Sequence, residues 1–238
     1  MPSNAFIAGL RRRFTPGQYF GLQLSLGVLA FIFSASLFGW LAEDVSSGEP
    51  ITQLDASIAM WWARHQTPVI RELMVFVSWF HTWPIAAISL VFLAYLLWAR
   101  NWMWAIVGAT AVAGGVSLNT ALKLAFHRER PTYSGLAAAL NTYSFPSGHT
   151  LAAMVIYAVF AAYAISKVRS RNLRTLIALG ACSVVSLVAF SRIYLGVHYL
   201  SDVVAGLAEG IAWFALCYTA TTTLFARWRR KRQQISTA

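Results

Sequence analysis

Six long stretches of this sequence are almost free of charge, and this pattern restricts the chain to folds that lipid can surround. A helix needs about 20 mostly apolar residues to cross the hydrocarbon core of a bilayer. The stretches predicted to span are Tyr19–Leu41, Trp83–Ala99, Trp104–Leu122, Thr150–Ser166, Thr175–Phe190 and Val203–Ala226. Only 11% of the residues are charged and 58% are hydrophobic, whereas roughly a quarter are charged in a soluble domain. We therefore expect an all-α, polytopic membrane protein that forms one domain over residues 1–238.

Two apolar segments need separate treatment. Tyr19–Ala42 runs for 24 residues without a charge, whereas the apolar part of a signal peptide has about 7–15 residues. It is predicted to remain as the first span. Leu73–Phe80 is too short to cross a bilayer, so it is predicted to lie in the interface, on the outer side of the membrane.

The basic residues predict the orientation of these spans. The net charge is +11, but the cations gather next to apolar stretches instead of forming a continuous surface that could bind nucleic acid. Their clusters lie at Arg11–Arg13, Lys167–Arg174 and Arg227–Arg232. Basic residues beside spans are retained in the cytoplasm. We therefore expect a protein of the inner, cytoplasmic membrane with both termini in the cytoplasm, a lipid bilayer as its surroundings and no nucleic-acid partner.

Four cations break this rule, because the same threading places them on the outer side. They are Lys123, Arg128, Arg130 and Arg192. The polar residues on this side gather in three segments, Lys123–Pro131, Phe145–Thr150 and Ser191–Asp202. Cations placed against the topological rule indicate that an anion binds there.

The residue types in these segments suit a phosphate group. Pro146-Ser147-Gly148-His149 precedes an apolar helix, and free backbone N–H groups at a helix N-terminus attract an anion. Gly148 allows the backbone to approach the ligand closely. Arg130 and Arg192 can bind phosphate oxygens in bidentate fashion, and Lys123 adds a point charge.

A pair of side chains in the third segment suits nucleophilic chemistry. His198 and Asp202 are four residues apart, so on a helix they share one face. A carboxylate beside an imidazole fixes its tautomer and leaves the other ring nitrogen free to attack. Each motif alone has a structural alternative, because Ser147 could simply cap a helix and His198 with Asp202 could be a structural pair. Their joint occurrence on one side of the membrane favours a catalytic site.

Together the three segments resemble the signature of the type 2 phosphatidic acid phosphatase superfamily. The matching patterns are Lys123-x6-Arg130-Pro131, Pro146-Ser147-Gly148-His149 and Ser191-Arg192-x5-His198-x3-Asp202. The resemblance implies metal-independent dephosphorylation of a membrane lipid phosphate through a phosphohistidine, with no cofactor. It implies His198 as the nucleophile, Asp202 as its partner and His149 as the acid–base group. Phosphate would be bound by Lys123, Arg130, Ser147, Gly148 and Arg192.

Several lipid phosphates suit a site at the outer, periplasmic end of a membrane bundle. They are undecaprenyl diphosphate, phosphatidylglycerol phosphate, phosphatidic acid and the phosphates of lipid A. Transfer of the phosphate to a second lipid remains an alternative to hydrolysis. Vanadium haloperoxidases share the signature, but those relatives are soluble. A transporter is the non-enzyme alternative, and it would need polar residues along a path across the bilayer.

The remaining polar residues are predicted to have lesser roles. His127, Arg128 and Glu129 are predicted to form a solvated turn, and His65 and His81 are predicted to be interfacial. Glu209 lies within the last span, where an acid is costly and often functional, so both a substrate role and a packing role fit. The two cysteines, Cys182 and Cys217, are predicted to be packing residues.

Overall fold

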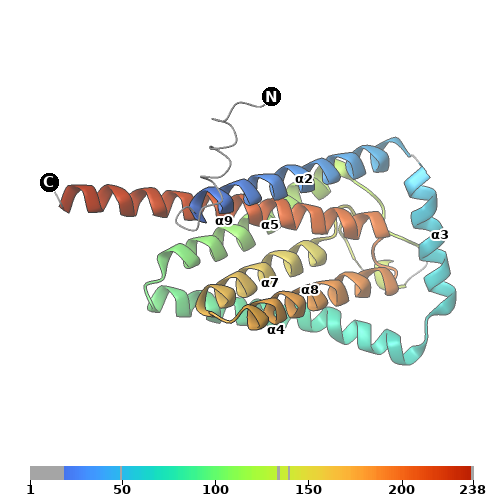
Figure 1. Ribbon diagram of the computed structural model, residues 1–238. Helices are drawn as coiled ribbons and strands as arrows, with labels where there is room; N and C mark the ends of the chain where they lie inside the picture. Colours follow the sequence, from blue (N-terminus) through green and yellow to red (C-terminus); the bar gives the residue numbers. More distant parts are fainter. Residues whose placement is uncertain (1–18, 49, 133–134, 139, 237–238) are drawn as a thin grey trace.

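All regular structure in the part of the chain that the computed structural model describes is helical. The described residues are 19–48, 50–132, 135–138 and 140–236, so Arg11–Arg13 lie outside them. The long helices lie side by side in one bundle, and one helix, α3, crosses its end (Figure 1). In chain order the helices are α2 (Tyr19–Ser47), α3 (Pro50–His65), α4 (Pro68–Trp98), α5 (Trp102–Phe126), α6 (Gly135–Ala138), α7 (Gly148–Lys167), α8 (Arg171–Tyr194) and α9 (Leu200–Ser236).

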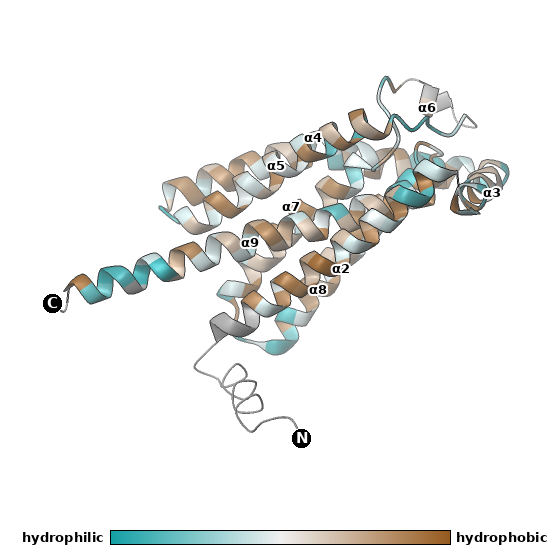
Figure 2. Ribbon diagram, turned by 90° about the horizontal axis from the view of Figure 1, so that it is seen from above, coloured by the Kyte–Doolittle hydropathy of each residue, from teal (hydrophilic) through white to brown (hydrophobic). Residues whose placement is uncertain are grey.

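Six of these helices are long and apolar enough to cross a membrane, as the sequence predicts. They are α2, α4, α5, α7, α8 and α9. Large apolar side chains such as Phe33, Val91 and Trp98 stay exposed on the bundle, as expected for a surface that faces lipid. The last helix runs on through its basic residues, and its hydrophilic end projects beyond the bundle (Figure 2).

The prediction that Leu73–Phe80 is a segment separate from the second span is wrong, because these residues belong to α4, a candidate span of 31 residues. That helix starts with Pro68 in its first turn, where the missing N–H costs nothing. It then continues through Pro84, since proline is tolerated within membrane helices. The helix that lies outside the bundle is α3, which precedes this segment.

Helix α7 lies at the centre of the packing. It contacts α5, α8 and α9, and α9 in turn packs along α2. The largest buried cluster joins α4, α5, α7 and α9 through side chains that include Leu96, Trp104, Val107 and Leu151. This core fixes the relative positions of the helix ends that carry the predicted site.

Candidate active site

The three predicted motif segments meet at the end of the bundle that α3 crosses. Lys123 lies near the end of α5, His149 in the first turn of α7, and Arg192 near the end of α8. His198 occupies the turn between α8 and α9, and Asp202 lies in the first turn of α9. The motifs therefore contribute side chains from four different helix ends to one site.

His198 and Asp202 form a buried pair. The Nδ1 atom of His198 is 3.3 Å from Oδ2 of Asp202, and the same oxygen accepts the backbone N–H of Tyr199 at 2.9 Å. Asp202 is fully buried and His198 is 2% exposed. The carboxylate favours the tautomer with its proton on Nδ1, which leaves Nε2 unprotonated.

The electrostatics keep this imidazole neutral. Burial lowers the pKa of His198 to about 3, although the hydrogen bond and charge of Asp202 oppose the shift. Arg192 and Arg130 add to the lowering, because both are cations close to the ring. Near neutral pH the ring therefore presents an unprotonated Nε2, which accepts a hydrogen bond from Nη1 of Arg130 at 3.3 Å.

Arg130 and Arg192 lie close to the His198 ring, and Lys123 lies close to both of these cations. Each of the three is held by groups of the protein. Arg130 donates to the carbonyl oxygens of Thr142 and Val197, both at 2.7 Å. Lys123 donates to the carbonyl oxygen of Tyr143 at 2.5 Å. Arg192 is buried and donates to the hydroxyl of Ser78 on α4, while its Nε has no partner among the described residues. No carboxylate contacts these three side chains in the described part of the chain, so their charge is available to an anion.

The prediction for Arg128 is wrong, because this residue is not in a solvated turn. Its guanidinium bridges two buried carboxylates, with Nη2 at 2.8 Å from Asp55 and Nη1 at 2.6 Å from Asp202. The guanidinium also lies over the ring of Tyr199, 4.4 Å from the centroid. Burial lowers the pKa of Arg128, but the two carboxylates outweigh this effect and raise the pKa above its usual value. Asp55 itself accepts the backbone N–H of Ser201 at 3.0 Å. This network ties α3 to the start of α9 beside the His198–Asp202 pair.

The Pro146–His149 segment packs tightly against α9. The backbone N–H of Ser147 donates to the carbonyl oxygen of Asp202 at 3.0 Å. A Cβ atom on Gly206 would lie 2.5 Å from the carbonyl oxygen of Ser147, and one on Gly148 would lie 2.9 Å from Oδ1 of Asn119. A side chain at either position would therefore push the loop and its neighbours apart.

Glu209 lies beneath this loop and supports it. Its Oε2 accepts from Nδ2 of Asn119 at 2.8 Å, and both residues are buried. Asn119 in turn is 3.5 Å from the carbonyl oxygen of Pro146. Of the two roles considered for Glu209, the structure favours packing below the site.

His149 lies between the cations and an apolar cavity. Its Nε2 is 3.0 Å from the hydroxyl of Thr82, which donates to the carbonyl oxygen of Ser78 at 2.9 Å. Because that hydroxyl proton is already used, we assign the proton in the His149–Thr82 bond to Nε2 of His149. His149 thus holds a proton on the cavity side of the site.

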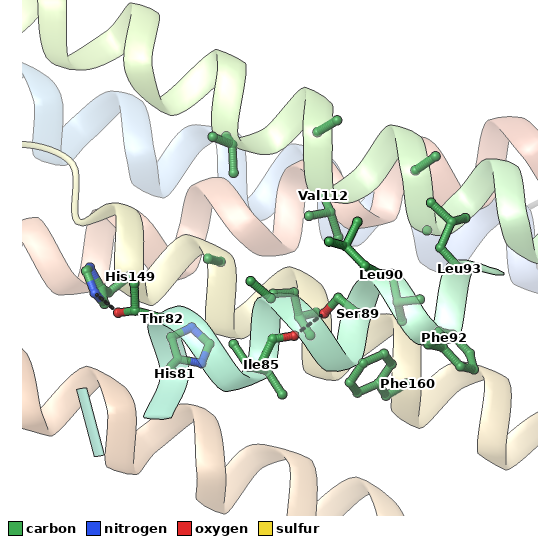
Figure 3. A pocket seen from close by; sticks show the side chains of 18 of the residues that line it. His81, Thr82, Ile85, Ser89, Leu90, Phe92, Leu93, Val112, His149 and Phe160 are labelled. Atoms are coloured by element: carbon green, nitrogen blue, oxygen red, sulfur yellow. Dashed lines mark hydrogen bonds between the residues drawn. The ribbon is translucent and has the colours of Figure 1, made fainter. Parts of the chain in front are cut away.

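The cavity runs away from His149 between α4, α5 and α7. Its volume is about 660 Å³, and its walls are almost entirely apolar. Figure 3 shows His149, Thr82 and His81 at one end and Leu90, Phe92 and Leu93 at the other. The prediction of an interfacial His81 is wrong, since this side chain is buried beside His149.

Three residues of the site were missed by sequence reasoning. Asp55 is a single acid in a segment without a motif, and Thr82 is one hydroxyl in an apolar stretch. Arg128 lies in the spacer of the first motif, and the sequence pointed to it only as one of four cations on the outer side. Within the described ranges, no group of three or more His, Cys, Asp or Glu side chains is placed to hold a metal ion.

Comparison with known proteins gives consistent matches. The chain is 35% identical over 101 residues to phosphatidylglycerophosphatase B of Bacillus subtilis, covering 42% of this chain and 49% of that protein. It is 35% identical over 136 residues to a lipid A 1-phosphatase of Rhizobium johnstonii, covering 53% and 50% of the two chains. The chain thus spans about half the length of these relatives.

The fold and a family model agree with these matches. The crystal structure of a transmembrane PAP2 type phosphatidylglycerolphosphate phosphatase from Bacillus subtilis superposes with a TM-score of 0.67 at 25% identity, covering 80% of this chain and 93% of that one. The model of the PAP2 superfamily matches residues 102–226, which is more than half of the chain and contains all three motifs. The chain therefore belongs to the PAP2 superfamily.

Proposed function

We propose that this protein is a metal-independent lipid phosphatase that transfers phosphate from a membrane lipid to His198 and then to water. One observation carries the proposal. The buried His198–Asp202 pair presents an unprotonated Nε2 beside Arg130 and Arg192. Neither these two cations nor the neighbouring Lys123 forms an ion pair with a carboxylate of the described residues. Two relatives, a phosphatidylglycerophosphatase and a lipid A 1-phosphatase, support the same class of reaction.

In the first step, Nε2 of His198 attacks phosphorus and the bond from phosphorus to the lipid oxygen breaks. The ring then carries a positive charge, which the Asp202 carboxylate stabilises through Nδ1. His149 enters this step as the imidazolium, protonated on both ring nitrogens, and the departing lipid oxygen takes the proton from Nε2, which leaves the His149 ring neutral. Transfer of a proton in this way typically contributes about 100- to 10,000-fold.

In the second step, water attacks the phosphohistidine. His149 takes a proton from that water, and the bond between phosphorus and nitrogen breaks to release inorganic phosphate and neutral His198. A second lipid in place of water would make the protein a phosphotransferase, by the same step.

Lys123, Arg130 and Arg192 bind the phosphoryl oxygens in this proposal, together with the backbone of Ser147 and Gly148 at the start of α7. These donors are fixed before the substrate arrives, so little reorganisation is needed as charge develops in the transition state. They supply the positive charge that a divalent cation supplies in other phosphatases, which is why we expect no metal requirement.

The substrate is proposed to enter from the membrane with its tail in the cavity between α4, α5 and α7. The opposite end of the bundle carries the basic Lys167–Arg174 turn, and the positive-inside rule places that end in the cytoplasm. The site then faces the periplasm. Phosphatidylglycerol phosphate, phosphatidic acid, undecaprenyl diphosphate and lipid A phosphates are the candidate substrates.

The test is phosphate release by purified protein in detergent from a panel of these lipids, with and without a chelator. We expect release from at least one lipid, no effect of the chelator, and complete loss in His198→Ala. His65→Ala is the matched control, because His65 is an exposed histidine on α3 outside the site. If His198→Ala is about as active as the control, His198 is not the nucleophile. If the chelator abolishes activity and one divalent ion restores it, the mechanism is not metal-independent.

A further inference from the structure

His81 is a buried histidine that the mechanism above does not use. It lies in α4 and is 4% exposed. Among the described residues, neither of its ring nitrogens has a hydrogen-bond partner. The backbone of His149 lies close enough to interact with the ring, but neither ring nitrogen makes a hydrogen bond of ordinary geometry with a described residue.

The His81 ring is held in place by its neighbours. It stacks on Tyr157 of α7 at 5.9 Å between centroids, and its centroid is 6.3 Å from that of His149. The next residue, Thr82, bonds to His149. The ring is therefore fixed by packing at the polar end of the apolar cavity (Figure 3).

Leaving both nitrogens unpaired is costly for the folded protein. A buried polar group without a partner destabilises the folded state, and a phenyl ring would fill the same space beside Tyr157 without that penalty. Packing alone therefore does not account for an imidazole at this position. A ligand that enters the cavity can supply the missing partner.

The composition of the cavity wall limits what that partner is. His81, Thr82 and His149 line the cavity, whereas Lys123, Arg130 and Arg192 do not. The cations thus surround the transferred phosphoryl group, and His81 faces the part of the substrate beyond the ester bond. A second phosphate at this position would place negative charge beside cavity-lining residues that include no Lys or Arg. An uncharged oxygen of the substrate therefore suits the position better.

We infer that His81 is a substrate-binding residue that hydrogen-bonds an uncharged hydroxyl or ester oxygen of the lipid backbone next to the phosphate ester. The inference rests on the proposed phosphatase function and deepens it. It assigns the site a preference for monophosphates on a glycerol or sugar backbone over phosphates carried directly on a hydrocarbon chain.

The test compares His81→Phe with wild type on three substrates: an acylglycerol phosphate, an n-alkyl phosphate of matched length and a prenyl diphosphate. We expect kcat/KM to fall about tenfold on the acylglycerol phosphate, as for loss of one hydrogen bond in a buried site. The loss should be at least five times smaller on each of the other two substrates. His81→Gln keeps a hydrogen-bonding group and should recover part of the preference.

Two controls separate recognition from a structural role. His65→Phe makes the same chemical change at an exposed ring that stacks on Trp61, and it should alter none of the three reactions. His81→Phe should not lower the melting temperature in detergent, because it keeps the ring and removes two unpaired nitrogens. A lowered melting temperature together with equal losses on all substrates would show that His81 is structural and overturn the inference.

The remaining outcomes are also decisive. A larger loss on the diphosphate would mean that His81 binds a second phosphate, which contradicts the inference while leaving the phosphatase function intact. If wild-type protein releases phosphate from none of the substrates, the proposed function itself fails. An acylglycerol-specific loss that His81→Gln reverses supports the inference.

Discussion

Replacing Gly206 by alanine tests whether α9 holds the Pro146–His149 loop, which we propose binds phosphate, in position. The added Cβ would lie 2.5 Å from the carbonyl oxygen of Ser147 and 3.3 Å from Cβ of Thr150. An ordinary contact is about 3.4 Å or longer, so the loop and α9 must separate by roughly 0.9 Å, the difference between 3.4 and 2.5 Å. The Ser147 N–H also bonds to Asp202, so the same shift moves the loop away from the His198–Asp202 pair.

A displacement of this size should affect activity more than stability. A misplacement of about 1 Å can cost about 100-fold in rate, so we expect kcat to fall about 10- to 100-fold. Alanine is favoured over glycine in a helix by about 1 kcal/mol, and this gain partly offsets an overpacking cost of about 1–3 kcal/mol. The melting temperature should therefore change little.

The assay is kcat and KM on the best lipid substrate, with the melting temperature measured in the same detergent. Gly180→Ala is the matched control, because that glycine lies in α8 and its Cβ would meet nothing within 4 Å. It should leave activity unchanged. Wild-type kcat in a folded Gly206→Ala protein would refute the reasoning, since the close packing would then have no bearing on the loop.

Three further predictions concern charge and orientation. Arg128→Met should destabilise the protein by about 3–5 kcal/mol, because it leaves the buried carboxylates of Asp55 and Asp202 unpaired. Asp55→Asn in the same chain should recover part of this stability, and a double variant whose loss equals the sum of the two single losses in denaturation would contradict the pairing. The lowered pKa of His198, about 3, means that the neutral ring required of the proposed nucleophile is present above that pH and is lost only below it. The acid limb of kcat/KM should therefore move with the second ionisation of two different aryl phosphates, and a limb fixed near 6.5 for both would contradict this. Reporters fused after Lys167 and near Ala137 should report cytoplasm and periplasm respectively, and reversed signals would overturn the orientation.

The spans could be predicted from the sequence because their signal is local. An apolar stretch long enough to cross a bilayer has few other stable environments, and every predicted span lies within or largely within an observed helix. The error at Leu73–Phe80 arose where that signal is interrupted. His81, Thr82 and Pro84 break the apolar stretch in the sequence, but packing against α5, α7 and α8 keeps α4 continuous.

The candidate site could be predicted only as far as its motifs extend. Spacing indicates that His198 and Asp202 share a helical face, and a Pro-Ser-Gly-His sequence indicates a helix N-terminus. The bridge of Arg128 between Asp55 and Asp202 joins residues 73 and 74 positions apart, and no local pattern encodes such a contact. His81 was misassigned for the same reason, since only the packing of α4 on α7 buries it.

The most direct test of the proposed mechanism is to trap phosphate on His198. The protein would be mixed with a lipid substrate carrying labelled phosphate, quenched in alkali within one turnover, and digested for peptide mapping. The account predicts label bound through nitrogen at His198, stable in alkali and lost in acid, and none in His198→Ala. Label on any other residue, or single-turnover release of phosphate with no labelled enzyme at any time point, would contradict it.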